Sequence, residues 1–263
     1  MLESVQRKYL NFMVNENNNI EKLRAMLQVY MGTFDYCYQF HAIKEFLEHS
    51  QGYIQKQKEA VNAIEAANAD VEYGDYVIAE EYHKSMYWDA AYSMAAVGQL
   101  APFLESLMTD YFLGLGRIYD KSTFKSNRFE RVKGYSWDPH FYFGKDKVRA
   151  DFCDGLKQLI EDLDIRSKLP EDTIKIFKAL MLYRNRMFHN GIEWPEEQRK
   201  NFRDYIQKHK MEHWFSYSIS GNDPWIYYME KTFIDECLKL AEFLINNLGG
   251  VGPAQKNKVI KTK

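Results

Sequence analysis

The chain has 263 residues, of which 46% are hydrophobic, and its formal net charge is −2 at pH 7. This length and composition suffice for a large hydrophobic core and argue against disorder except at the ends of the chain. A chain so close to neutral has no global field that attracts nucleic acid, so RNA binding would require a local basic patch. Because the sequence shows neither a signal-peptide pattern nor an apolar run long enough to span a membrane, we expect a cytoplasmic protein without a membrane partner.

Glycine and proline are scarce, with 14 and 6 residues, which favours long helices. The first predicted helix covers residues 20–30, where apolar side chains recur on one helix face at Ile20, Leu23, Leu27 and Tyr30. A second helix is predicted over 33–67, followed by a break at 68–75 that contains Gly74. Residues 80–119 predict a long helix or two, since Pro102 either kinks this segment or begins a new helix.

Residues 120–149 predict a long loop, because Gly134, Pro139 and Gly144 interrupt the helical pattern. Basic side chains outnumber acidic ones there, and aromatic side chains lie between them. This mixture suits stacking on RNA bases and contact with phosphates, so the candidate RNA-binding residues are Lys125, Arg128, Arg131 and Lys133, together with Trp214 from a later segment. The favoured alternative is a structured loop whose aromatic side chains pack on the helices and whose lysines are solvated.

The second half of the chain predicts further helices over 148–163, 170–190, 195–210 and 232–248, and a small β-hairpin near 214–228. The helix that begins at Pro170 carries acidic residues in its first turn, and Gly191 is a suitable residue to end it. The basic tail, residues 251–263, is expected to be disordered. The fold class is therefore predicted to be all-α with one small hairpin.

The helix over 170–190 carries the residues best suited to chemistry. Successive helix residues are about 100° apart, which places Arg184 in an apolar arc and Arg186 on the opposite, polar side. The predicted arc consists of Ile176, Phe177, Leu180, Met181, Met187 and Phe188. An arginine on an apolar face needs a partner and can grip a phosphate or carboxylate with two parallel hydrogen bonds. Asn185 and His189 are four residues apart, so they share one edge of the helix, at the carbonyl end that favours a protonated histidine.

These side chains match what RNA cleavage by its own 2′-hydroxyl requires. One group takes the proton of the 2′-hydroxyl, another protonates the leaving 5′ oxygen, and a cation stabilises the charge on the phosphate. No metal or other cofactor is needed, and the products are a 2′,3′-cyclic phosphate and a 5′-hydroxyl. We therefore take Arg184, Asn185 and His189 as the candidate catalytic residues.

The segment Tyr-Arg-Asn-Arg-Met-Phe-His-Asn-Gly, residues 183–191, resembles the R-x4–6-H motif of HEPN domains, in which a polar residue often follows the arginine. The resemblance implies a bundle of four to five helices over about residues 80–250, with residues 1–75 as additional N-terminal helices. It also implies an endoribonuclease that acts as a homodimer, with RNA as its substrate. Many HEPN proteins are toxins or antiviral effectors, so an antitoxin or defence-system partner is a further expectation.

Several alternatives stay open at this point. The helix carrying Arg184 could form a non-catalytic RNA-binding or dimerisation module, or a purely structural bundle in which Arg184 pairs with Glu105 or Asp110. Arg203 and His209 also satisfy the motif spacing, but their helix is charged throughout. Glu80 and His83 have the spacing of a di-iron ligand pair but lack a second such pair. The three cysteines show no metal or disulfide pattern and are expected to be reduced and mostly buried.

Overall fold

The computed structural model describes residues 19–32, 35–68, 74–121, 124–131 and 134–252. Helices dominate and two short antiparallel hairpins accompany them, so the predicted all-α fold with a small hairpin is confirmed. The chain forms two compact units, each built from separate stretches. Unit 1 combines residues from 1–40, 103–177 and 239–263, and unit 2 combines 41–102 with 178–238. These units cut across the sequence-based division near residues 75–80, which stays a prediction.

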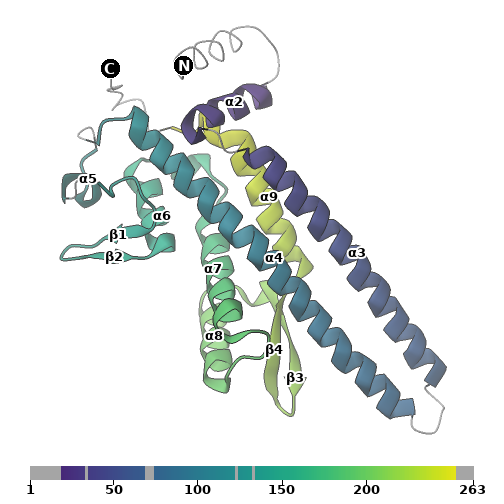
Figure 1. Ribbon diagram of the computed structural model, residues 1–263. Coiled ribbons are helices and arrows are strands. Elements are labelled where there is room, and N and C mark those ends of the chain that lie inside the picture. Colours follow the sequence, from purple (N-terminus) through teal and green to yellow (C-terminus); the bar gives the residue numbers. More distant parts are fainter. Residues whose placement is uncertain (1–18, 33–34, 69–73, 122–123, 132–133, 253–263) are drawn as a thin grey trace. The chain divides into compact units, whose positions relative to one another are not determined.

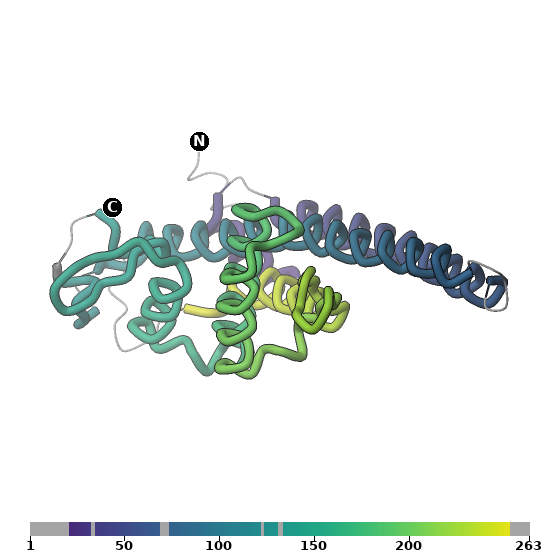
Figure 2. The backbone as a smooth tube through the Cα atoms, turned by 90° about the horizontal axis from the view of Figure 1, so that it is seen from below, coloured from purple at the N-terminus to yellow at the C-terminus, as the bar shows by residue number. Residues whose placement is uncertain are grey.

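Unit 2 contains most of helix α3 (Tyr36–Asn68) and the first half of helix α4 (Gly74–Ile118). Figures 1 and 2 both show α3 antiparallel to the first half of α4. Lys58 of α3 pairs with Asp89 of α4 at 2.9 Å, and the Tyr92 hydroxyl donates to the Leu47 carbonyl at 3.2 Å. α4 continues through Pro102 as one helix. Pro102 itself is exposed while residues on either side of it are buried, so packing offsets the hydrogen bond that proline removes.

The rest of unit 2 contains the end of α7 (Thr173–Asn190), α8 (Glu196–Lys208) and the hairpin of β3 (Phe215–Ser220) and β4 (Asp223–Met229). A short 3₁₀ turn, η3 (Glu212–Trp214), precedes β3. Aromatic rings join these elements into one cluster, formed by Tyr183, Trp194, Phe202, Phe215 and Tyr227. The buried Ser93 hydroxyl of α4 accepts the Met229 backbone N–H at 2.8 Å. The predicted hairpin is thus held to the helices by ring packing and by a buried hydrogen bond.

Unit 1 contains α2 (Asn19–Met31), the second half of α4 and the end of α9 (Lys231–Asn247), which continues into the 3₁₀ turn η4 (Leu248–Gly250). α2 lies directly against η4. A Cβ atom at Gly249 would come within 1.9 Å of the Leu23 carbonyl oxygen, so this close approach requires glycine. The Tyr111 hydroxyl donates to the Val251 carbonyl, and Val251 is buried. The predicted tail therefore begins in the packed part of the unit, and its residues 253–263 lie outside the described residues.

The segment predicted as a loop, 120–149, is more ordered than expected. It contains α5 (Asn127–Arg131) and a three-residue pairing of β1 (Phe141–Phe143) with β2 (Val148–Ala150). The helix predicted from residue 148 was placed too early, because these residues pair with β1. Helix α6 (Phe152–Asp162) begins after Asp151, whose side chain accepts the Asp154 N–H, and the 3₁₀ turn η2 (Arg166–Lys168) follows it. The aromatic side chains Phe124, Phe129, Trp137 and Phe143 are buried, so the packed alternative is correct for them.

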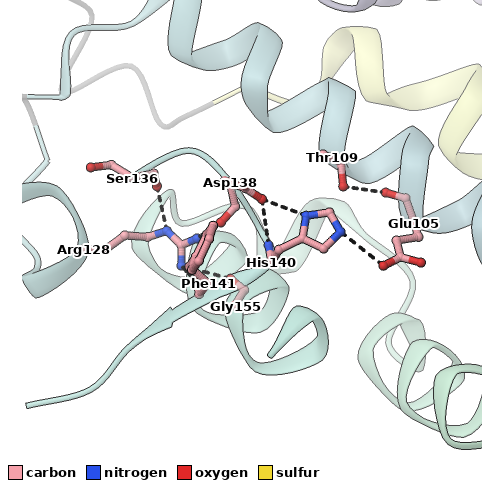
Figure 3. Close-up of polar contacts among 8 residues, drawn as sticks. All are labelled: Glu105, Thr109, Arg128, Ser136, Asp138, His140, Phe141 and Gly155. Carbon is pink, nitrogen blue, oxygen red and sulfur yellow. Dashed lines mark hydrogen bonds and ion pairs between the residues drawn. The ribbon is translucent and has the colours of Figure 1, made fainter. Parts of the chain in front are cut away.

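Arg128 organises this segment (Figure 3). Its side chain is fully buried, and its guanidinium donates to the carbonyl oxygens of Ser136 and Phe141, both at 2.7 Å, and to that of Asp138. It also donates to the Gln158 side chain at 3.1 Å. Burial lowers the pKa of Arg128 to about 10, while Asp162 and Asp138 act in the opposite direction, so the group is charged at neutral pH. The predicted RNA-binding role of Arg128 is therefore wrong, because its guanidinium is buried and donates its hydrogen bonds to oxygen atoms of the protein itself.

Replacing Arg128 by methionine is expected to lower the free energy of unfolding by roughly 3 kcal/mol or more, since several buried carbonyl groups lose their donor. Arg128→Lys should also destabilise, because an ammonium group cannot reproduce the planar fork. Urea unfolding followed by circular dichroism measures both changes. The matched control is Lys125→Met, an exposed residue three positions earlier, which should stay within about 0.5 kcal/mol of the unsubstituted chain. Equal stabilities of all these chains would contradict the structural role of Arg128.

Candidate active site

The last turns of α7 are anchored by one buried face. Its centre is formed by Ile176, Leu180, Tyr183 and Met187, which recur every three or four residues and are buried. The Tyr183 hydroxyl donates to the Tyr227 carbonyl of β4 at 3.0 Å, and burial raises the pKa of this phenol well above its ordinary range. This face fixes the rotation of the helix about its axis and therefore decides where its polar residues point.

The three candidate catalytic residues lie on the flank and outer side of this helix end. Arg184 is half-buried, and its Nη1 atom lies 3.9 Å from the Met181 sulfur. Asn185 and His189 are both exposed, one turn apart. The structure therefore keeps the arginine next to apolar surface and leaves the amide and the imidazole accessible.

The predicted arc differs from the buried face in phase. Phe188, expected on the apolar side, is 58% exposed, whereas Tyr183 is fully buried. The centre of the buried face therefore lies away from Arg184, and the two arginines flank it on opposite sides. Arg186, predicted on the polar side, is half-buried and donates to the Gln198 side chain of α8. The two arginines therefore have different contacts. The predicted contrast between an apolar surrounding for Arg184 and a polar one for Arg186 does not describe this difference, because both residues are half-buried beside the buried face.

The end of α7 is built as the sequence predicts. Gly191 adopts a positive φ of 73°, and its N–H donates to the Met187 carbonyl at 2.9 Å. The Trp194 indole N–H donates to the Gly191 carbonyl, also at 2.9 Å. The Asn190 side chain donates to the Arg186 carbonyl at 3.0 Å. This cap holds His189 in the last helical turn, where the free carbonyl groups of a helix attract positive charge.

The residues that the sequence predicts to bind RNA do not form one exposed surface. Lys125 is exposed, but Trp214 is 1% exposed and stacks on Phe233 with ring centroids 4.7 Å apart. Trp214 is thus a core residue, and its predicted contact with RNA is wrong for the same reason as that of Arg128. The side chain of Arg131 and the whole of Lys133 lie outside the described residues.

A polar cluster that sequence reasoning missed lies in unit 1 around His140 (Figure 3). The His140 Nδ1 atom is 2.8 Å from an Asp138 carboxylate oxygen, and Nε2 is 3.1 Å from a Glu105 carboxylate oxygen. A neutral imidazole carries one N–H, so only the protonated ring donates to both carboxylates. The hydrogen bond with Glu105 is the main cause that raises the pKa of His140 above its ordinary value; partial burial opposes the rise and Asp138 adds to it.

This cluster borders a cavity of about 450 Å³, whose lining also includes Tyr36, Thr109 and Asp110. The Tyr36 hydroxyl donates to Asp110. Glu105 and Asp110, the carboxylates considered as partners of Arg184, thus face His140 and Tyr36 within unit 1. The Asp-x-His spacing of 138 and 140 is visible in the sequence, whereas Glu105 is 35 residues away and joins the cluster only through the fold.

The other residues considered from the sequence have ordinary surroundings. Glu80 lies 3.1 Å from Lys84, and the His83 ring packs on Trp225 with centroids 5.2 Å apart. The three cysteines form no disulfide with one another, but only Cys237 is buried, Cys153 is half-buried and Cys37 is exposed, so the expectation of mostly buried thiols is wrong. Within the described ranges, no group of three or more His, Cys, Asp or Glu side chains is arranged to hold a metal ion.

Comparison with protein-family models, with curated proteins and with solved structures finds no match. Among the helices that the structure describes, none combines the length and apolar character needed to cross a bilayer.

The His140 cluster predicts a pH dependence of stability. Because the folded-state pKa is raised, protonated His140 stabilises the fold fully below about pH 6.5, and this contribution is lost as the pH rises through the folded-state pKa. We expect the stability difference between the unsubstituted chain and His140→Asn to be largest at acidic pH and to shrink above about pH 6.5. Urea unfolding at several pH values measures it. In a Glu105→Gln background the same difference should vary less with pH; a difference that grows with pH would refute this assignment.

Proposed function

We propose that this chain is a metal-independent endoribonuclease of the HEPN type, with Arg184, Asn185 and His189 as its catalytic residues. The observation that carries the proposal is the arrangement at the end of α7. A half-buried guanidinium lies within two turns of an exposed imidazole, and both stand on a helix end held by a buried face and a tight cap. Acid–base chemistry and phosphate binding are therefore available at the same helix end, on different sides of a rigid element.

In the proposed reaction, a base removes the proton of the RNA 2′-hydroxyl and the 2′ oxygen attacks the adjacent phosphorus. The bond from phosphorus to the 5′ oxygen breaks, and an acid protonates that oxygen. His189 serves in proton transfer, Arg184 holds the phosphate oxygens with its planar fork, and Asn185 supplies a hydrogen bond beside His189. The products are a 2′,3′-cyclic phosphate and a 5′-hydroxyl, and no water is consumed in this step.

Helix geometry favours a site shared between two copies. Five positions separate Arg184 from His189, so these residues point about 140° apart around the axis and lie about 7.5 Å apart along it. One copy's arginine and the other copy's histidine could meet across a two-fold axis, because such an interface brings the same patch of each copy together. Phe188 lies between them in sequence and is 58% exposed. In such a homodimer the exposed part of the Phe188 ring, whose end lies beside Gly98 of α4, would be covered by the other copy.

Replacing His189 by alanine is expected to reduce RNA cleavage by roughly 100-fold or more, the usual contribution of a positioned acid or base. The assay incubates tRNA and mRNA with the purified chain in EDTA and identifies the end groups of the products. The matched control is His209→Ala, since His209 is also exposed at a helix end and belongs to the second arginine–histidine spacing. Equal cleavage by His189→Ala and the unsubstituted chain would remove the catalytic assignment.

Phe188→Asp is expected to convert the dimer into a monomer and to reduce cleavage at least ten-fold, because a charge in an apolar interface is costly to bury. Light scattering during size-exclusion chromatography measures the mass, and the cleavage assay is repeated on the same fractions. The control is Tyr217→Asp, an exposed aromatic residue on β3. A variant that is monomeric and fully active would show that one copy suffices.

The exposed Phe188 equally suits a non-catalytic dimerisation or RNA-binding module. In that case RNA would bind without being cut, and His189→Ala would change neither property. A role as a toxin or antiviral effector, with an antitoxin or defence-system partner, is what the HEPN resemblance implies and forms part of the proposal.

A further inference from the structure

A second cavity, of about 230 Å³, lies in unit 2 between α8 and β4. Three basic side chains of α8 line it, namely Arg199, Lys200 and Arg203. Its opposite side includes Tyr227 and Asp223 of β4, and Glu196 lies at the start of α8. The cavity is smaller than the sites that hold drug-sized ligands, so it suits one small chemical group.

The positions of these residues follow from packing. Phe202 and Ile206 are buried on the inner face of α8, which turns Arg199 and Arg203, one helical turn apart, toward one side of it. The Tyr227 ring is stacked on Trp194 at 5.5 Å and lies edge-on to Phe202 at 5.0 Å. Its backbone carbonyl accepts the Tyr183 hydroxyl at 3.0 Å. One side of the cavity is therefore fixed by the buried Tyr227 ring, while the half-buried Arg199 and Arg203 and the exposed Lys200 reach it from α8.

Two polar atoms of these lining residues are buried without a hydrogen-bond partner. They are the Tyr227 hydroxyl, on a side chain that is only 1% exposed, and the Arg199 Nε atom. Each such buried group costs about 1–3 kcal/mol unless something accepts or donates a hydrogen bond. Arg199, Lys200 and Arg203 also form no ion pair with any residue that the structure describes. A cavity that gathers unused donors is suited to a ligand rich in acceptors.

The charges in the cavity favour an anion. Three cationic side chains face two carboxylates, those of Glu196 and Asp223. Burial raises the pKa of Tyr227 to about 12, and Arg203 and Arg199, which line the same cavity, act in the opposite direction. The phenol is therefore protonated at neutral pH and serves as a donor. Guanidinium forks and a hydroxyl donor match the oxygens of a tetrahedral oxyanion.

We propose that this cavity binds a phosphate group, held by Arg199, Arg203 and the Tyr227 hydroxyl, with Lys200 adding positive charge. The phosphate is either free inorganic phosphate or the phosphate of a nucleotide or nucleic acid, which present the same oxygens. This site is separate from the catalytic residues of α7 and does not rest on the proposed ribonuclease activity.

The test is calorimetric titration of the full chain with inorganic phosphate at constant ionic strength, with sodium chloride as the matched salt. The unsubstituted chain should bind phosphate, and Arg203→Gln should weaken binding roughly ten-fold or more, the usual effect of losing a charged hydrogen bond. Lys208→Gln, an exposed residue of the same helix, should bind like the unsubstituted chain. Absence of phosphate binding at millimolar concentration, or equal binding by Arg203→Gln, would overturn the proposal.

Tyr227→Phe supplies a second test, which stays informative even if Arg203→Gln fails to fold. It should weaken phosphate binding several-fold, and without phosphate it should be at least as stable as the unsubstituted chain, because the removed hydroxyl has no partner there. Unchanged binding by this variant, or a clear loss of stability without phosphate, would contradict the assignment of the hydroxyl.

A parallel titration with a nucleoside 5′-monophosphate separates the two sources. Tighter binding of the nucleotide than of inorganic phosphate, lost in Arg203→Gln, assigns the cavity to nucleotide or nucleic-acid phosphate. Binding of inorganic phosphate that is equal or tighter assigns it to the free anion. Because these titrations measure binding alone, their outcome is independent of the cleavage assay on His189→Ala.

Discussion

The buried face of α7 is the constraint on which both proposed sites of unit 2 depend. Tyr183 is fully buried in the aromatic cluster, where its hydroxyl donates to the Tyr227 carbonyl of β4 and also forms a hydrogen bond with Ser93 of α4. The bond to the Tyr227 carbonyl fixes the rotation of α7 and the position of β4 together. The rotation of α7 determines which side chains its last turns leave accessible, and the position of β4 determines where the Tyr227 ring lies. The hydrogen bonds of Tyr183 and the rings around it therefore orient two separate sets of polar residues.

Much of the helical organisation follows from the sequence, because apolar spacing, Gly191 and Pro195 mark real helix ends. The phase of α7 could be predicted only approximately. Phe188 looks like a core residue and Tyr183 looks amphipathic, and the pattern does not reveal that the Tyr183 hydroxyl finds a backbone carbonyl. The pairing of β1 with β2 was missed since three residues per strand give no measurable alternation. Arg128 was misassigned because most of its acceptors are backbone carbonyl groups. Every residue has such a group, so the sequence does not reveal which carbonyls the fold brings together around an arginine.

Buried polar groups in this chain fall into two kinds, and the distinction separates structural from functional roles. The donors of Arg128 that the structure resolves meet carbonyl and amide oxygens of the same unit. Such a group stabilises a loop and offers nothing to a ligand. Arg199 and Tyr227, in contrast, leave a buried Nε atom and a buried hydroxyl without acceptor or donor beside a cavity. The Nε atom of Arg186 is also buried without a partner but does not line this cavity, so such an atom alone does not mark a site. At Arg199 and Tyr227 the cavity beside them leaves room for the proposed phosphate to complete the hydrogen bonds.

The same comparison bears on the motif of α7. Arg186 and Arg184 are two positions apart, and both flank the buried face. The Arg186 guanidinium donates to the side chain of Gln198, the residue that directly precedes Arg199 in α8. Arg186 thereby helps to hold α8 against α7. The Arg184 side chain lies against the Met181 thioether, which is a weak acceptor. Arg186, the arginine outside the motif, therefore has a structural role between α7 and α8, so we assign the proposed phosphate contact to Arg184, the arginine that matches the motif spacing with His189.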